Sequence, residues 1–268
     1  MNILDKIIEQ KRKEVAEKKE ITPVKLLERS IHYSTSCVSF KKYLLRPDKT
    51  GIIAEIKRKS PSKGFINKHI SVEQLSIGYM MAGASALSVL TDKEFFGGTN
   101  DDLSVARKYN YCPILRKDFT IDEYQIIEAK SIGADVILLL ANVLDAATIK
   151  QFAKLAKSLG MEVLLEVRDK KELSNVNEFI DAVGVNNRNL EDFSVNVSQS
   201  FDLAKLIPND FVKISESGIS KAETIHQLKD AGFKGFLIGE TFMKHARPDV
   251  ACAECIKEVN AYKTLHEA

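Results

Sequence analysis

The chain has 268 residues, of which 44% are hydrophobic and 28% charged, and its formal net charge is +2. This composition is ordinary for a globular protein, and the small net charge argues against nucleic acid or a membrane surface as the main partner, because such proteins normally carry a basic patch. The short basic run at residues 11–13 is expected to lie on a solvated helix surface. There is no signal-peptide core, and the longest apolar run, residues 136–141, is too short to span a bilayer, so a cytoplasmic protein is predicted.

Cysteine and histidine give no indication of a metal or redox centre. The four cysteines are scattered, and the Cys-x-x-Cys at Cys252 and Cys255 falls in a late helical stretch without the strand–helix–strand context of a redox motif. The five histidines show no metal-ligand spacing. We therefore expect no metal site.

The first fifty residues predict a helical extension. Apolar residues recur at helical spacing over residues 2–19, and Thr22-Pro23 favours the start of a short second helix that reaches Leu27. A further turn is expected around Phe40, before Pro47. Because these segments are amphipathic, they must pack on another part of the molecule.

From residue 51 onward, short apolar runs alternate with amphipathic helical patterns. Strands are expected at residues 52–57, 86–90, 113–117, 135–140, 162–167, 182–185, 211–215 and 235–239. Such alternation predicts an α/β fold with a parallel sheet, and eight units in little over two hundred residues match a (β/α)8 TIM barrel with an N-terminal helical extension. A doubly wound sheet is the alternative, but no Gly-x-Gly-x-x-Gly follows the first strand. Without a linker or a break in composition, residues 1–268 are predicted to form one barrel domain, with residues 1–50 as an extension covering the barrel mouth.

Charged or amide side chains end six of the eight predicted strands. In the first strand, Glu55 and Lys57 share a face with Ile53, and burying unpaired charges there would cost several kcal/mol. In TIM barrels the C-terminal strand ends carry the function, so these positions indicate an active site. The candidate residues at these ends are Glu55, Lys57, Lys117, Glu166, Asn186, Arg188, Glu216, Ser217 and Glu240.

The loops after the last two strands predict a phosphate site. Gly218 and Gly239 precede helices, and backbone N–H groups at such places bind anions. The fourth strand presents an apolar face that includes Leu138, and aromatic residues follow the second and third strands, at Phe95, Phe96 and Phe119. These features favour a ligand with an aromatic ring at one end and a phosphate at the other.

Eight motifs, in order and spacing, resemble the indole-3-glycerol phosphate synthase family of tryptophan biosynthesis: AEIKRKSPSKG, LTDKEFFGG, LRKDF, GADVILLL, LLEV, GVNNRNL, SESGI and LIGE. The resemblance runs from the N-terminal helix to the end of the chain. It implies ring closure of 1-(2-carboxyphenylamino)-1-deoxyribulose 5-phosphate with loss of carbon dioxide and water, without a metal or organic cofactor. It also implies a monomer, with possible association with other enzymes of the pathway, and an extension packed over the barrel mouth.

The resemblance further assigns roles to individual positions. Lys117 is similar to the general acid that protonates the substrate carbonyl, Glu166 and Glu55 to the carboxylates that serve dehydration, and Lys57 to the lysine that engages the substrate carboxylate. The remaining roles are the anthranilate end for Asn186 and Arg188, the sugar hydroxyls for Glu216 and Ser217, the phosphate shell for Ser60, Gly218, Gly239, Glu240 and Thr241, and the ring contact for Leu138.

Two alternatives remain at this point. Another phosphosugar barrel, such as phosphoribosylanthranilate isomerase, would lack the extension and would have a cysteine in its acid–base pair on the first strand, where this chain has Glu55 and Lys57. A barrel that only binds phosphorylated ligands would tolerate the loss of Lys117 or Glu166, and both are present.

Overall fold

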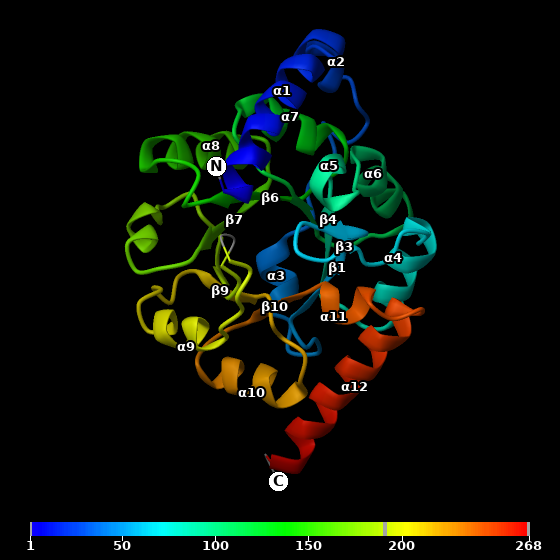
Figure 1. The fold of residues 1–268 in the computed structure, drawn as a ribbon, viewed down its shortest axis with the longest axis vertical. Coiled ribbons are helices and arrows are strands. Elements are labelled where there is room, and N and C mark those ends of the chain that lie inside the picture. The colour runs from blue at the N-terminus through cyan, green and yellow to red at the C-terminus, as the bar shows by residue number, and fades with distance from the viewer. Residues whose placement is uncertain (1, 190–191, 267–268) are drawn as a thin grey trace.

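A computed structural model describes residues 2–189 and 192–266. Eight parallel strands close into a barrel in the order β1-β10-β9-β8-β7-β6-β5-β4, which confirms the predicted TIM barrel (Figure 1). The ring closes between β1 and β10, where Ile52 pairs with Phe236. The strands are β1 (Ile52–Ile56), β4 (Ala86–Leu90), β5 (Ile114–Lys117), β6 (Val136–Leu140), β7 (Glu162–Val167), β8 (Ala182–Asn186), β9 (Val212–Glu216) and β10 (Gly235–Ile238).

Helices follow the strands and cover the outside of the barrel. They are α4 (Val72–Met81), α5 (Lys93–Phe96), α6 (Asn100–Tyr109), α7 (Glu123–Ser131), α8 (Ala146–Ser158), α9 (Ser198–Ala204), α10 (Ala222–Asp230), α11 (Glu240–Met243) and α12 (Pro248–His266). After β7 the described chain forms only a short 3₁₀ helix, Glu172–Asn175, and the loop after β1 forms a small hairpin of β2 (Lys59–Ser60) and β3 (Gly64–Phe65).

Two apolar layers follow from the two faces of each strand. Ile52, Ala54 and Ile56 pack outward against the helices, whereas Ile53 points into the barrel with Leu115. This alternation has the period of two that a strand imposes, and it matches the expected parity. Because Glu55 shares the inward face of Ile53, the same alternation directs its carboxylate into the barrel.

The extension divides between the two ends of the barrel. It comprises α1 (Ile3–Ile21), α2 (Val24–Leu27) and α3 (Phe40–Leu44). Figure 1 shows α1 and α2, in blue, projecting beyond the barrel on the side opposite α12. The first turns of α1 lie at the C-terminal strand ends, whereas α3 lies at the N-terminal ends, where the Lys41 backbone N–H donates to Glu162 Oε2 at 2.7 Å, at the start of β7. The extension as a whole therefore does not cover the mouth.

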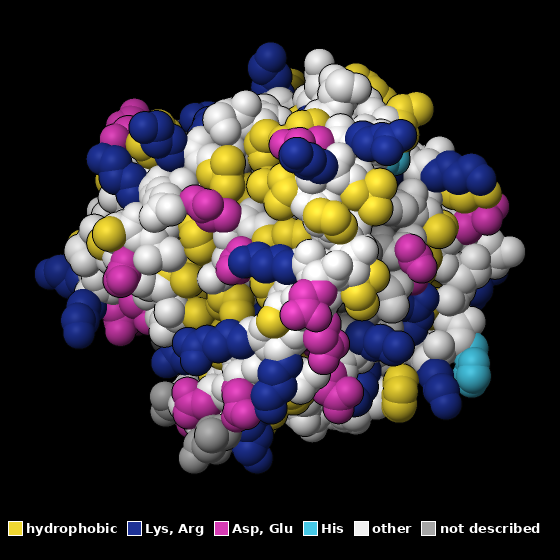
Figure 2. All heavy atoms as spheres, turned by 90° about the horizontal axis from the view of Figure 1, so that it is seen from above, with side chains coloured by type: hydrophobic (Ala, Val, Ile, Leu, Met, Phe, Trp, Pro, Cys, Tyr) yellow, Lys and Arg dark blue, Asp and Glu magenta, His cyan; other side chains and the backbone are white. Residues whose placement is uncertain are grey.

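Charges of both signs are interspersed on the face shown in Figure 2, with apolar side chains between them. None of the helices in the described part of the chain is long and apolar enough to cross a membrane.

Candidate active site

A cavity of about 120 Å³ lies at the C-terminal end of the barrel. Charged side chains from β1, β5, β7 and β9 form part of its lining, and α1 contributes Ile3, Leu4 and Ile7. The cavity therefore has a polar part inside the barrel and an apolar part beneath α1. The sequence-predicted residues in its lining are Glu55, Lys57, Ser60, Lys117, Phe119, Leu138, Glu166, Asn186, Arg188, Glu216, Ser217 and Glu240.

Lys117 lies at the centre of the polar part. Its ammonium group contacts Glu166 Oε2 at 2.7 Å and Glu216 Oε2 at 2.8 Å, although the three residues come from three different strands. Burial alone would lower the pKa of Lys117, but the carboxylates of Glu166, Glu216 and Glu55 outweigh it and raise the pKa. The lysine is thus held protonated before any substrate binds.

The two carboxylates on Lys117 have different protonation behaviour. Burial alone would raise the pKa of Glu166, but Lys117 and a hydrogen bond of 2.9 Å from the Asn186 amide outweigh it and lower the pKa. Burial and the neighbouring Glu166 raise the pKa of Glu216 to about 7, against the opposing effect of Lys117. Glu216 Oε1 is also a buried atom without a hydrogen-bond partner in the described structure. Glu216 is therefore the carboxyl group that exchanges a proton near neutral pH.

Glu55 and Lys57 form a second pair, with Lys57 Nζ 2.6 Å from Glu55 Oε1. The Lys57 side chain is 16% exposed and that of Glu55 only 4%, so the ammonium group lies closer to the open side of the cavity. Gly239 leaves room for this carboxylate, because a Cβ there would come within 2.3 Å of Glu55 Oε1.

A glycine that sequence reasoning missed makes room for Glu216 in the same way. Gly184 lies inside β8, where a glycine weakens a strand and often indicates close approach of another group. A Cβ at Gly184 would come within 2.3 Å of Glu216 Oε1. The isolated glycine within the run AVGV was the available signal, but the partner that approaches it is 32 residues away in the sequence.

The loops after β8 and β9 place further polar groups at the cavity. The Arg188 guanidinium contacts Glu240 Oε2 at 3.2 Å, while the Arg188 backbone N–H donates to Asn186 Oδ1 at 3.0 Å. Ser217 has a φ of 69°, a left-handed conformation that is costly for a residue other than glycine and that occurs preferentially at functional sites. Gly218 follows it with a φ of 75°.

Four predicted residues are absent from the lining of this cavity among the residues that the structure describes: Phe95, Gly218, Gly239 and Thr241. Thr241 donates its hydroxyl to the Ile219 carbonyl at 3.0 Å and so ties the start of α11 to the loop after β9. Phe96, the neighbour of Phe95, lines the cavity instead, and its ring lies 6.0 Å from that of Phe119. The sequence does not show which of these adjacent phenylalanines faces the cavity, because this depends on how α5 is rotated about its axis.

In the described ranges no group of three or more His, Cys, Asp or Glu side chains is arranged to hold a metal ion. Lysines already engage the acidic groups of the cavity, at Glu55, Glu166 and Glu216. The arrangement suits proton transfer and the binding of an anionic ligand, because it combines two partly buried ammonium groups with carboxylates of different pKa.

Comparisons with known proteins identify the family. The family model described as indole-3-glycerol phosphate synthase matches residues 4–255. The enzyme of that name from Bacteroides thetaiotaomicron is 46% identical over 258 residues, covering 96% of this chain and 99% of the relative. The one from Thermoanaerobacter pseudethanolicus is 43% identical over 243 residues, with coverages of 90% and 92%.

Solved structures support the fold alone. The chain is similar to 3-hexulose-6-phosphate synthase from Salmonella typhimurium, with a TM-score of 0.62 and 13% identity, over 79% of this chain and 99% of that one. A tryptophan synthase structure from Pyrococcus furiosus gives a TM-score of 0.58 and 15% identity, with coverages of 80% and 99%.

Proposed function

Since the chain belongs to the indole-3-glycerol phosphate synthase family and is a carboxy-lyase of tryptophan biosynthesis, we propose that Lys117 is the general acid of its ring closure. In this reaction a ring carbon of the anthranilate attacks the ketone carbon of the deoxyribulose chain. The ketone oxygen needs a proton as it becomes a hydroxyl group, and the carboxylate leaves as carbon dioxide. The hydroxyl group then leaves as water, and a neighbouring carbon loses a proton to complete the indole ring.

The observation that carries this proposal is the position of Lys117 between two carboxylates at the centre of the cavity. A general acid must hold its proton in the resting enzyme and must reach the oxygen that becomes basic. The raised pKa of Lys117 supplies the first condition. Because the lysine lines the cavity, its ammonium group is also accessible to a bound ketone.

Glu166 and Glu55 are the proposed carboxylates of the dehydration step. Removal of a carbon-bound proton needs a base that is ionised, and Glu166 is kept ionised by Lys117 and by the Asn186 amide. Loss of the hydroxyl group needs a proton donor, and Glu216, whose pKa of about 7 leaves it partly protonated at neutral pH, can supply that proton through Lys117, which it contacts at 2.8 Å.

Lys57 and Arg188 are proposed to bind the anthranilate carboxylate until it leaves, since both are cationic and both line the cavity. The ring would then lie in the apolar part, against Leu138 and the pair Phe96 and Phe119.

The phosphate is proposed to bind near Ser60 and the start of α11. Ser60 is mostly buried at the edge of the cavity, and Glu240 begins α11 directly after Gly239. The Glu240 carboxylate is engaged by Arg188 and lies 3.9 Å from Lys63, so its contribution to the phosphate shell would come from the backbone N–H. Gly218 and Thr241 would complete the shell by shaping the two loops around it.

Incubation of the purified chain with 1-(2-carboxyphenylamino)-1-deoxyribulose 5-phosphate tests the function. Appearance of indole fluorescence is expected, and it is easy to follow because the chain contains no tryptophan. Absence of product from a correctly folded sample would contradict the assignment. A monomeric state, a cytoplasmic location and association with other pathway enzymes stay predictions.

A further inference from the structure

One lysine lies in the middle of the apolar stripe of α1. The buried residues of this helix are Ile7, Lys11 and Val15, each four positions from the next and therefore on one face. Lys11 is only 1% exposed, which makes the expectation of a solvated surface for this residue wrong. A lysine is almost never fully buried unless it is paired, so the burial of Lys11 requires oppositely charged partners.

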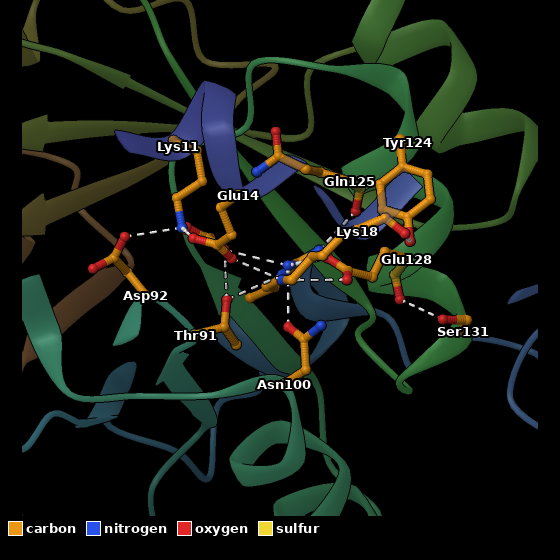
Figure 3. Close-up of polar contacts among 12 residues, drawn as sticks. Lys11, Glu14, Lys18, Thr91, Asp92, Asn100, Tyr124, Gln125, Glu128 and Ser131 are labelled. Carbon is orange, nitrogen blue, oxygen red and sulfur yellow. Dashed lines mark hydrogen bonds and ion pairs between the residues drawn. The ribbon is translucent and has the colours of Figure 1, made fainter. Parts of the chain in front are cut away.

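Three carboxylates surround the ammonium group of Lys11. Its Nζ lies 2.9 Å from Asp92 Oδ2, 2.9 Å from Asp118 Oδ1 and 2.8 Å from Glu14 Oε2. Figure 3 shows Lys11 reaching from α1 toward Asp92. An ammonium group has three N–H donors, so these contacts satisfy it completely.

The two aspartates also hold the aromatic residues of the cavity. Asp92 Oδ1 accepts the Phe95 backbone N–H at 2.8 Å and so caps α5, the helix that carries Phe96. Asp118, the residue that follows Lys117, accepts the Phe119 backbone N–H through its Oδ1 at 2.8 Å. Lys11 thus joins the two loops that present Phe96 and Phe119 to the cavity.

Apolar contacts alone would not fix where α1 lies along this surface. A helix with apolar residues at every fourth position can shift by one turn, about 5.4 Å, and still bury a similar stripe. Polar groups with a single set of partners remove this freedom, as a buried asparagine does in coiled coils. Near the end of α1 the Tyr124 hydroxyl donates to the Lys18 and Thr22 carbonyls, and at the cavity end this role falls to Lys11. Here a one-turn shift would also move Ile3, Leu4 and Ile7 away from the cavity that they line.

We propose that Lys11 is a positioning residue for the reaction: its ammonium group, held by Asp92 and Asp118, fixes the register of α1 and the placement of the aromatic pair that receives the anthranilate ring. This inference rests on the proposed binding of the ring between Phe96, Phe119 and Leu138. Lys11 does not line the cavity in the described structure and would act through its two carboxylate partners.

Lys11→Met tests the proposal, with Lys13→Met as the matched control, because Lys13 is on the same helix with a 62% exposed side chain and pairs only with Glu9 among its described contacts. Lys11→Met should raise KM about tenfold and weaken binding of the product by a similar factor, with a smaller effect on kcat. Backbone amides of α1 and of residues 119–122 should exchange hydrogen faster. Lys13→Met should leave all of these at wild-type values.

A double variant separates positioning from stability. In Lys11→Met, Asp92 loses its cation, and adding Asp92→Asn removes the unpaired charge while keeping an acceptor for the cap of α5. We expect the unfolding temperature to recover in the double variant while KM and the product Kd stay raised. Recovery of KM together with stability, or an unchanged KM in Lys11→Met, would overturn the proposal.

The proposed function has a separate outcome in this design. Product binding and hydrogen exchange report the position of α1 without any chemistry, so they keep their meaning even if Lys117 is not the general acid. If Lys117→Met retained the wild-type kcat, the proposed role of Lys117 would fail and the measurements on Lys11 would stand. If Lys11→Met left product binding unchanged, the proposed role of Lys11 would fail and the proposed role of Lys117 would stand.

Discussion

Two clusters of buried charges contain neighbouring residues of β5, Arg116 and Lys117, and the two clusters differ in how completely their charged groups are paired. One contains Lys117 and points into the barrel, and the other contains Arg116, on the outward face of β5, and Asp118, beneath α1. Arg116 contacts Glu128 Oε2 at 2.5 Å and Asp118 Oδ2 at 3.2 Å. In the outer cluster, burial alone would raise the pKa of Asp118 and of Glu128, yet their cationic partners outweigh it and lower both. In the inner cluster the pKa of Glu216 is raised to about 7.

The difference shows what separates a structural ion network from a catalytic one of similar composition. In the outer cluster the charged states are stabilised, so none of these carboxyl groups has a reason to exchange protons near neutral pH. In the inner cluster one ammonium group serves two carboxylates, and Glu216 Oε1 has no partner in the described structure. Incomplete pairing costs stability and leaves a group that can accept or release a proton.

Lys117→Met should have the largest effect. Removal of the proton donor is expected to lower kcat by at least ~10²-fold, with a much smaller change in KM. Steady-state and single-turnover kinetics would measure this. Lys57→Met is the informative comparison, because loss of a counter-ion should raise KM as well. A loss confined to KM in both variants would direct the search for the acid to Glu55 or Glu166.

Arg116→Met tests the outer cluster. Removing one partner of a buried ion network leaves Glu128 and Asp118 short of a cation, which should cost about 3–5 kcal/mol of unfolding free energy. Urea unfolding would measure the loss. At temperatures where the variant is folded, the pH dependence of kcat should keep its wild-type shape, and a shifted profile would contradict the separation of the two clusters.

Glu216→Gln should remove a part of the pH dependence of the folding stability. The pKa of about 7 in the folded state lies above the ordinary glutamate value of 4.5, so ionisation of Glu216 destabilises the folded state increasingly from about pH 4.5 to pH 7. Glutamine cannot ionise. The stability of the variant relative to wild type should therefore increase from pH 5 to pH 8, by on the order of 2 kcal/mol. Thermal unfolding of both proteins at both pH values would measure this change. An equal difference at both pH values would contradict the raised pKa.

Ser60→Ala should have the smallest effect. Loss of one hydrogen bond to a charged phosphate at the edge of the cavity should cost about 1.5 kcal/mol, the lower end of the usual range, which corresponds to a rise in KM of about tenfold. The value of kcat should stay near wild type, because the phosphate is remote from the reacting carbons. A fall in kcat without a change in KM would place Ser60 outside the phosphate shell.

The barrel and most of its inward-facing residues could be predicted because strands impose a period of two. Parity predicts Glu55 on the inner face, the strand ends predict Lys117 and Glu166 at the site, and all three line the cavity. Lys11 could not be found in this way, since a lysine on a helix normally lies on the solvated side. Its burial depends on Asp92 and Asp118, which are about 80 and 107 residues further along the sequence.

The division of the extension was also invisible in the sequence. An amphipathic segment shows that one face will be buried, but not against what. The α1 helix and α3 both carry apolar residues, and only the three-dimensional structure separates the mouth from the opposite end. In the same way, the requirement for glycine at position 184 follows only from the three-dimensional structure, in which the Glu216 carboxylate lies beside it.

The placement of α3 has a consequence for the order in which the molecule can assemble during synthesis. Phe40 and Leu44 leave the ribosome early, but Glu162, which accepts the Lys41 backbone N–H, follows more than a hundred residues later. At ~5–20 residues per second this interval is roughly 6 to 24 seconds. During that time the apolar residues of α3 are only partly covered, because several of their partners, on β8, β9 and β10, are made later still. The earliest part of the chain to be made is thus among the last to dock, and slower translation extends the period in which nascent chains can associate with one another.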